Sequence, residues 1–97
     1  MALTSKQRAK LRALANNTDT ILQIGKGGVT DAVVRQTEQA LAARELIKLR
    51  VLESALMSPR EACEILCEEL SAEPVQVIGT RFVIYRKDEK EPKIQID

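Results

Sequence analysis

The stretch Thr20-Ile-Leu-Gln-Ile-Gly-Lys-Gly-Gly-Val-Thr-Asp31 places a β-branched run, a glycine-rich loop and a helix start in direct succession. Thr20–Ile24 is short and bounded by turn-forming residues, which is typical of a strand. Thr30 is a favoured helix-capping residue, and Asp31 puts an acid in the first turn, where the helix dipole favours it. The stretch therefore predicts a strand that passes through a tight loop into a helix.

The same kinds of signal continue on both sides of this unit. Thr4 and Gln7 have the spacing of a capping box, which predicts a helix beginning at Thr4. Apolar and polar residues alternate over Glu45–Leu52, as in a strand. Ser58-Pro-Arg-Glu61 combines an N-cap serine, a proline at the first helical position and a capping-box glutamate, which predicts another helix.

The segment Pro74–Arg86 has the pattern of a β-hairpin. Gly79-Thr80 suits a two-residue turn with glycine in the first position. This register would place Val77 opposite Phe82 and Val75 opposite Ile84. We therefore expect these four apolar side chains to share one face of the hairpin.

The predicted order of elements is α-β-α-β-α-β-β. Helices between strands imply right-handed crossovers, so we expect a compact α/β fold with a four-stranded mixed sheet and packed helices. The 97 residues suffice for one domain spanning 1–97, in which residues 88–97 form a charged tail.

The N-terminal segment carries basic residues where the apolar core of a signal peptide would lie. They are Lys6, Arg8, Lys10 and Arg12. The apolar runs are also shorter than the roughly 20 residues that a membrane-spanning helix needs. We therefore expect a cytoplasmic protein that does not contact a membrane.

Groups suited to catalysis or metal binding are scarce. The chain has no histidine, and its two cysteines, Cys63 and Cys67, are expected to be packing residues and not zinc ligands or a disulfide. The loop at 25–28 has neither the P-loop spacing nor the dinucleotide-binding spacing of glycines. We expect no cofactor, no metal and no enzymatic activity, and a nucleotide-processing enzyme is the least favoured alternative.

Charge is distributed unevenly, although the formal net charge is +1. In residues 1–29 the only acid is Asp19, and the basic side chains are Lys6, Arg8, Lys10, Arg12 and Lys26. Residues 61–73 contain no base, and their acids are Glu61, Glu64, Glu68, Glu69 and Glu73. A basic end of this kind is suited to binding a polyanion.

The loop Gly25-Lys-Gly-Gly28 has the composition of a phosphate-binding site. Glycines let backbone N–H groups face outward and let a ligand backbone approach without meeting a Cβ atom. The N-terminus of the following helix favours an anion, and Lys26 adds a cation. A plain turn between strand and helix is the alternative explanation for the glycines.

Aromatic side chains are limited to Phe82 and Tyr85, and there is no tryptophan. Recognition by base stacking is therefore not expected, and binding should depend on phosphate, sugar and shape. Arg81, just after the hairpin turn, is a further candidate contact.

Five ordered segments together resemble the CRM domain, and in particular its stand-alone bacterial YhbY-type members. The segments are Leu3–Arg8, Gln23–Thr30, Glu45–Val51, Val75–Gly79 and Val83–Arg86. The resemblance implies a fold similar to the C-terminal domain of translation initiation factor 3. It also implies a G-x-x-G loop like that of KH domains, which clamps a nucleic-acid backbone.

The resemblance further implies a role as an assembly factor that binds ribosomal RNA in precursors of the large ribosomal subunit. Basic residues of the first helix would lie beside the glycine loop. The predicted RNA-binding residues are Gly25, Lys26, Gly27, Gly28, Lys6, Arg8, Lys10, Arg12 and Arg81. We expect a monomer. The alternative is a protein-interaction module that docks basic ribosomal proteins on the acidic third helix, through Glu64, Glu68 and Glu69.

Overall fold

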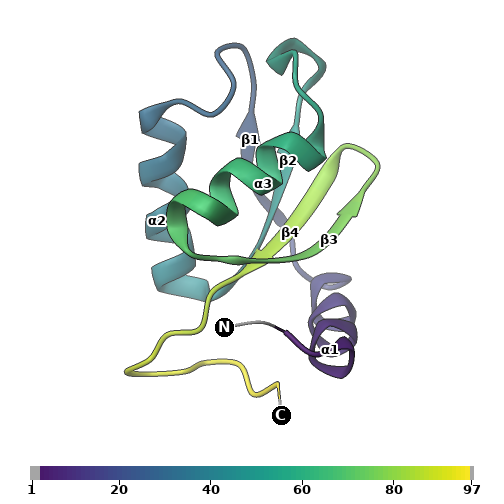
Figure 1. Cartoon of the computed structure of the whole chain (residues 1–97), viewed down its shortest axis with the longest axis vertical. Coiled ribbons are helices and arrows are strands. Elements are labelled where there is room, and N and C mark those ends of the chain that lie inside the picture. Colours follow the sequence, from purple (N-terminus) through teal and green to yellow (C-terminus); the bar gives the residue numbers. More distant parts are fainter. Residues whose placement is uncertain (1–2, 97) are drawn as a thin grey trace.

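The computed structural model describes residues 3–96. Its elements are α1 (Ser5–Ala15), β1 (Thr20–Ile24), α2 (Asp31–Arg44), β2 (Leu46–Val51), a 3-10 turn η1 (Glu53–Ala55), α3 (Pro59–Leu70), β3 (Glu73–Ile78) and β4 (Arg81–Tyr85). The predicted order of helices and strands is confirmed, and η1 is a short addition between β2 and α3 (Figure 1).

The four strands form one mixed sheet in the order β1-β2-β4-β3. β1 and β2 are parallel, whereas β4 is antiparallel to both of its neighbours. Parallel pairing of β1 and β2 requires a crossover, and α2 supplies it. The predicted α/β fold class is therefore confirmed.

The helices begin where the sequence places their caps. Thr4 Oγ1 accepts a hydrogen bond from the N–H of Gln7 at 3.1 Å, and the Gln7 side chain accepts one from the N–H of Thr4 at 3.0 Å. Ser58 and Glu61 make the same reciprocal pair, with both distances at 3.1 Å. Thr30 Oγ1 accepts from the N–H of Val33 at 3.2 Å, so all three predicted caps are formed.

The face of the sheet under α2 and α3 is covered along its length, and we call it the closed face. The side chains of Leu41 on α2 and Leu66 on α3 pack there against Leu49 and Phe82 of the central strands. All four are at most 1% exposed. Each such side chain contributes about 1.5–3 kcal/mol to folding by leaving water, so this face holds most of the core.

The opposite face, which we call the open face, is covered over one part by α1 and the C-terminal segment 87–96. Leu11 and Ala15 of α1 pack against Tyr85 of β4, and Ile96 of the C-terminal segment joins them. α1 lies at the lower end of the molecule in Figure 1. The remainder of this face, toward the upper end, has no helix over it.

Glu45 holds the C-terminal segment in place. Its buried carboxylate accepts hydrogen bonds from the backbone N–H groups of Asp88 at 2.7 Å, Lys93 at 2.6 Å and Ile94 at 2.8 Å. Three hydrogen bonds to one charged group offset the cost of burying it. The C-terminal segment 87–96 therefore lacks helix and strand but is packed against the domain.

The hairpin differs from its predicted register in one position. Val77 lies opposite Phe82 as expected, but Pro74 and not Val75 is the partner of Ile84. The prediction for Val75 is therefore wrong, because the pairing shifts between Pro74 and Gln76. Proline has no N–H to donate to the ladder and is found at bulges and edge strands. The shift turns Val75 toward α1, away from the closed face.

Candidate nucleic-acid interface

The glycine loop between β1 and α2 is a closed turn. The N–H of Gly28 donates to the carbonyl of Gly25 at 2.9 Å, and the N–H of Thr30 donates to the carbonyl of Gly28 at 3.1 Å. Gly27 has φ = 100° in the third position of the turn, a conformation that glycine adopts without strain. The loop is thus held in one shape by its own hydrogen bonds.

The glycines of this loop differ in why a glycine is needed. Gly27 and Gly28 both have positive φ, and a Cβ atom on the buried Gly28 would lie 3.0 Å from Cε of Met57. Gly25 does not have positive φ, and its Cβ would make ordinary contacts, 3.5 Å from Leu52 and 3.7 Å from Ser54. Conformation and packing therefore explain Gly27 and Gly28 but not Gly25.

The loop presents donors that an anion can use. Within residues 3–96, no protein acceptor takes the N–H groups of Lys26, Gly27 or Val29. The Lys26 side chain is exposed and forms none of the ion pairs found in that range. Asp31, in the first turn of α2, partly offsets the positive helix end. The outward-facing side of the loop is thus the part suited to a phosphate, whereas Gly28 is buried and its N–H closes the turn.

A second loop, residues 52–57, lies against the glycine loop. The N–H of Leu52 donates to the carbonyl of Ile24 at 2.8 Å, and Met57 reaches over Gly28. Both loops lie at the upper end of the molecule in Figure 1. This end is therefore built from two connections that follow the parallel strands β1 and β2.

The basic helix α1 lies at the other end. It precedes β1, whereas the glycine loop follows β1, and a strand of five residues is roughly 16 Å long. The expectation that α1 lies beside the loop is therefore wrong (Figure 1). Lys6, Lys10 and Arg12 are exposed at the lower end. Arg8 is half-buried, and its Nε donates to the carbonyl of Pro74 at 3.2 Å, which ties it to β3.

Three cations on the uncovered part of the open face occupy the space between these two ends. Arg50 of β2 lies directly opposite Arg81 of β4, and Lys48 is two residues along β2 on the same side. Arg81 reaches across to β1, where its Nε donates to Thr20 Oγ1 at 3.1 Å. We call this set the sheet cations.

Of the sheet cations, the sequence prediction named Arg81 and missed Lys48 and Arg50. The alternation over Glu45–Leu52 already put these two side chains on the face opposite Ile47 and Leu49. What was missing was the pairing of β2 with β4, which brings Arg81 beside them.

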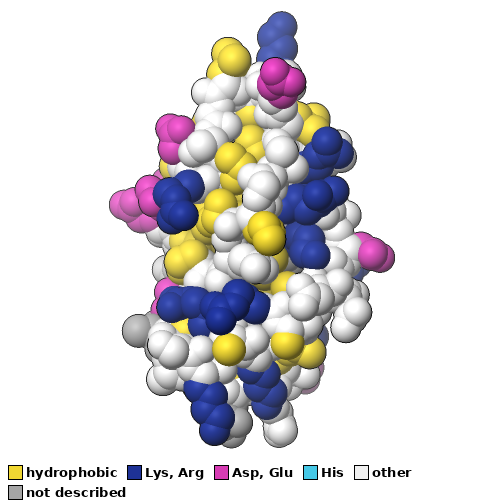
Figure 2. Space-filling view, turned by 90° about the vertical axis from the view of Figure 1, so that its right-hand side faces the viewer, with side chains coloured by type: hydrophobic (Ala, Val, Ile, Leu, Met, Phe, Trp, Pro, Cys, Tyr) yellow, Lys and Arg dark blue, Asp and Glu magenta, His cyan; other side chains and the backbone are white. Residues whose placement is uncertain are grey.

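The sheet cations have no acidic partner among the described residues. The ion pairs found there join Arg86 to Glu38 and Lys93 to Asp88. Figure 2 shows Lys and Arg side chains on both sides of a strip of hydrophobic ones on one side of the molecule. Like charges directly opposite each other on neighbouring strands are destabilising, so Arg50 and Arg81 are better accommodated with a polyanion over them.

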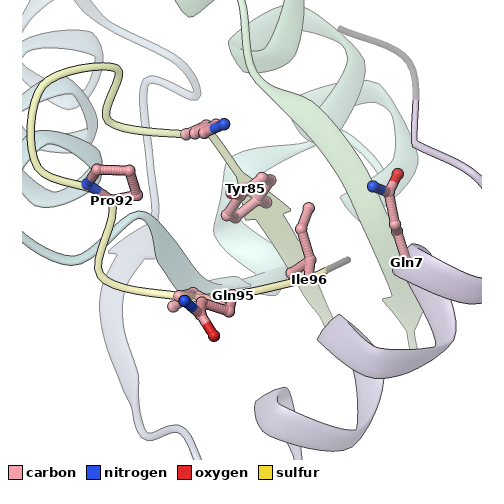
Figure 3. A pocket seen from close by; sticks show the side chains of 7 residues that line it. Gln7, Tyr85, Pro92, Gln95 and Ile96 are labelled. Atoms are coloured by element: carbon pink, nitrogen blue, oxygen red, sulfur yellow. The ribbon is translucent and has the colours of Figure 1, made fainter.

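A cavity of about 200 Å³ lies away from this surface, between α1, the end of β4 and the C-terminal segment. Figure 3 shows Gln7, Tyr85, Pro92, Gln95 and Ile96 around it. The Tyr85 hydroxyl is buried without a hydrogen-bond partner in the described structure, and burial, with the charge of Glu45, raises its pKa. No residue predicted to bind RNA lines this cavity.

The cysteines behave as the sequence predicts, with Cys63 buried and Cys67 half-buried in α3. Over residues 3–96, His, Cys, Asp and Glu side chains form no group of three or more that could hold a metal ion. In the same range, none of the helices is long and apolar enough to span a bilayer.

Known proteins of similar sequence and structure span nearly the whole chain. The probable RNA-binding protein YqeI of Bacillus subtilis (strain 168) is 37% identical over 94 residues, covering 97% of this chain and 98% of that protein. An RNA-binding protein of Haemophilus influenzae is 34% identical over 94 residues, covering 97% and 94%. The solution structure of the hypothetical protein SAV1595 from Staphylococcus aureus matches with a TM-score of 0.79 and 40% identity, covering 99% of this chain and all of that one.

The pattern that defines the CRS1 / YhbY (CRM) domain matches residues 3–86. The match therefore includes α1, the glycine loop and all four strands, and it ends before the C-terminal segment. It agrees with the resemblance carried by the five sequence segments. The chain belongs to the CRS1/YhbY (CRM) domain family.

Proposed function

We propose that this protein binds RNA and seats the phosphate backbone on the loop Gly25-Lys-Gly-Gly28. Gly25 is the observation that carries the proposal, because neither its backbone conformation nor its packing requires a glycine. A ligand backbone that must approach the loop closely supplies the missing reason. The relatives named as RNA-binding proteins support RNA as that ligand.

Phosphate oxygens would accept hydrogen bonds from the N–H groups of Lys26 and Gly27 and from the Lys26 ammonium. The sheet cations would hold the backbone as it leaves the loop and crosses the open face. α1 would meet the RNA farther along, through Lys6, Lys10 and Arg12. Such contacts position RNA without reading its bases, and their strength falls as salt rises.

The RNA we propose is ribosomal, in a precursor of the large subunit, where the protein would serve as a non-enzymatic assembly factor in the cytoplasm. The family supports this context. The geometry supports recognition of a folded RNA, because the loop and α1 lie at opposite ends of a molecule 38 Å long. An RNA that contacts both ends must present phosphates over a comparable distance.

Titration of large-subunit ribosomal RNA fragments at two salt concentrations tests the loop. We call the loop at 25–28 the phosphate seat. Gly25→Asp with Lys26→Ala places an acid in this seat and removes its cation. A Cβ atom at residue 25 has room, so the fold should persist. We expect affinity to fall at least tenfold, while Lys90→Ala, an exposed lysine of the C-terminal segment, binds as wild type. Equal binding by the double variant and wild type would show that the loop is not the site.

The second candidate function is docking of a basic protein on α3. Glu64, Glu68 and Glu69 are exposed on this helix, and Ile65 between them is also exposed. A pull-down from nuclease-treated extract separates the two functions. Partners that survive removal of RNA, and are lost in a Glu64→Gln/Glu68→Gln variant, would support protein docking.

A further inference from the structure

Three residues other than glycine have positive φ in the described chain, and each of them ends a helix or helical turn. Glu45 (φ = 65°) turns its carboxylate inward, where it holds the C-terminal segment. Ser71 (φ = 54°) ends α3, and its N–H donates to the carbonyl of Cys67. The third is Leu56 (φ = 57°), which ends η1 and whose N–H donates to the carbonyl of Glu53 at 3.4 Å. A left-handed conformation is costly for leucine, whereas glycine and asparagine adopt it readily.

Packing of the Leu56 side chain does not offset this conformational cost. It is 94% exposed, more than any other large hydrophobic residue described in the chain, the next being Ile78 at 60%. A leucine so exposed buries almost no apolar surface and therefore adds almost nothing to folding. The backbone of Leu56 ends η1, but that role does not call for a leucine. A strained leucine whose side chain has no packing role points to a function of that side chain.

The position of Leu56 connects it with the phosphate seat. Its neighbours on both sides face the glycine loop: Met57 Cε lies 3.0 Å, and the Ala55 carbonyl 4.0 Å, from where a Cβ of Gly28 would be. Both are turned inward, and Ala55 is buried. Leu56 therefore projects outward from the loop that borders the seat, at the upper end of the molecule, where hydrophobic and charged side chains lie side by side (Figure 2).

We infer that Leu56 is an RNA-contacting residue, which packs against the sugar and base of the nucleotide next to the phosphate held by the loop at 25–28. The inference rests on the proposed function. Sugar and base faces are the apolar parts of a nucleotide, and aliphatic side chains are known to wedge against bases. Leu56 thereby takes the place of the aromatic platform that the chain lacks.

The charges around Leu56 agree with this orientation. Lys26 is the cation of the seat, and Glu53, exposed in η1, is the acid of the neighbouring loop. An acid here repels phosphate, so the backbone lies on the Lys26 side and the nucleoside on the side of residues 53–56. A protein partner would need an apolar area larger than this one side chain supplies, which is why we assign Leu56 to RNA.

The test uses the full chain and the same ribosomal RNA fragment. Leu56→Asn suits the left-handed backbone, so its melting temperature should equal or exceed that of wild type, while RNA affinity falls about fivefold, the low end for loss of a base-packing side chain. The loss should be the same at both salt concentrations, because an apolar contact releases no counterions. Leu56→Met keeps an apolar side chain and should bind with nearly wild-type affinity. Leu14→Gln replaces an exposed leucine on α1 and should bind as wild type.

The outcomes separate this inference from the proposed function. If Lys26→Ala weakens binding and Leu56→Asn does not, the inference is overturned and the phosphate seat stands. The inference is also overturned if the effect of Leu56→Asn disappears at high salt, or if Leu56→Met binds as weakly as Leu56→Asn. If wild type does not bind RNA, or Lys26→Ala and Leu56→Asn both bind as wild type, the proposed function and the inference fall together.

Discussion

The closed and open faces of the sheet share the same strands but differ in what covers them. α2 and α3 cover the closed face, where Ile47 and Leu49 of β2 are fully buried. On the other side of β2, α1 and the C-terminal segment cover Leu46 but leave Lys48 and Arg50 partly exposed. One strand thus contributes to the core with one set of alternating residues and to a charged surface with the other.

The two faces therefore differ in role: the closed face serves stability, and the uncovered part of the open face is the proposed binding surface. Burial of apolar side chains on the closed face supplies most of the hydrophobic free energy of folding. The open face instead retains Arg50 opposite Arg81, and like charges directly opposite each other on neighbouring strands are destabilising. We expect substitutions on the two faces to affect different measurements.

The largest effect on stability is expected from the closed face. Leu49→Ala should lower the free energy of unfolding by about 2–5 kcal/mol, because it opens a cavity under α3. Lys48→Ala, the adjacent residue of β2, should change it by less than about 0.5 kcal/mol. Urea denaturation measures both. Similar losses for the two variants would mean that the faces do not differ as described.

The next effect concerns the part of the open face that is covered. Glu45→Gln keeps the shape of the side chain but replaces the charged carboxylate that accepts three hydrogen bonds from N–H groups. It should lower the free energy of unfolding by about 1.5–3 kcal/mol. Hydrogen exchange should show lost protection at Asp88, Lys93 and Ile94, with the amides of α3 protected as before at low denaturant. Protection unchanged at these three amides would contradict the role assigned to Glu45.

A smaller effect on stability, but a clear one on binding, is expected from the uncovered part. Replacing all three sheet cations by alanine should leave the melting temperature unchanged or higher. The slope of log affinity against log salt should fall by about 2, since each phosphate contact contributes about 0.7–0.9. Arg35→Ala, an exposed arginine of α2, is the matched control. An unchanged slope would exclude the sheet cations from the interface.

The smallest effect is expected at the ion pair of Arg86 with Glu38, outside both faces. Hydrogen bonding to Arg86 holds the pKa of Glu38 below its ordinary value of 4.5. A lowered pKa means that the folded state binds this proton less tightly, so the stabilisation is present above pH 4.5 and is lost as pH falls below it. Because Glu38 is exposed, Glu38→Gln should flatten the acid limb of the stability curve only slightly. A steeper acid limb in the Glu38→Gln variant would contradict a stabilising ion pair between Glu38 and Arg86.

Features that depend on neighbouring residues could be predicted from the sequence. The capping boxes at Thr4 and Ser58, the strand at Thr20–Ile24 and the turn at Gly79-Thr80 all arise within a few residues, and all four are present. The glycine loop was found in the same way, because its glycines and the Thr30 cap are adjacent in sequence.

Features that depend on pairing between distant segments could not be predicted in full. The bulge near Val75, the position of Arg50 beside Arg81 and the docking of residues 87–96 on Glu45 all depend on such pairing. The wrong prediction that α1 lies beside the glycine loop has a simpler cause. Helix and loop are close in sequence, but an extended strand separates them, and the predicted strand already implied that they lie at opposite ends.

An NMR titration of the ¹⁵N-labelled protein with a large-subunit ribosomal RNA fragment tests directly whether RNA binds at the glycine loop, because it locates the bound surface residue by residue. We expect the amides of Lys26, Gly27 and Val29 to shift most, followed by those of β2 and β4 around the sheet cations. Amides on the exposed face of α3, at Glu64 and Glu68, should stay in place. Shifts concentrated on α3, with the loop amides unmoved, would contradict binding at the glycine loop.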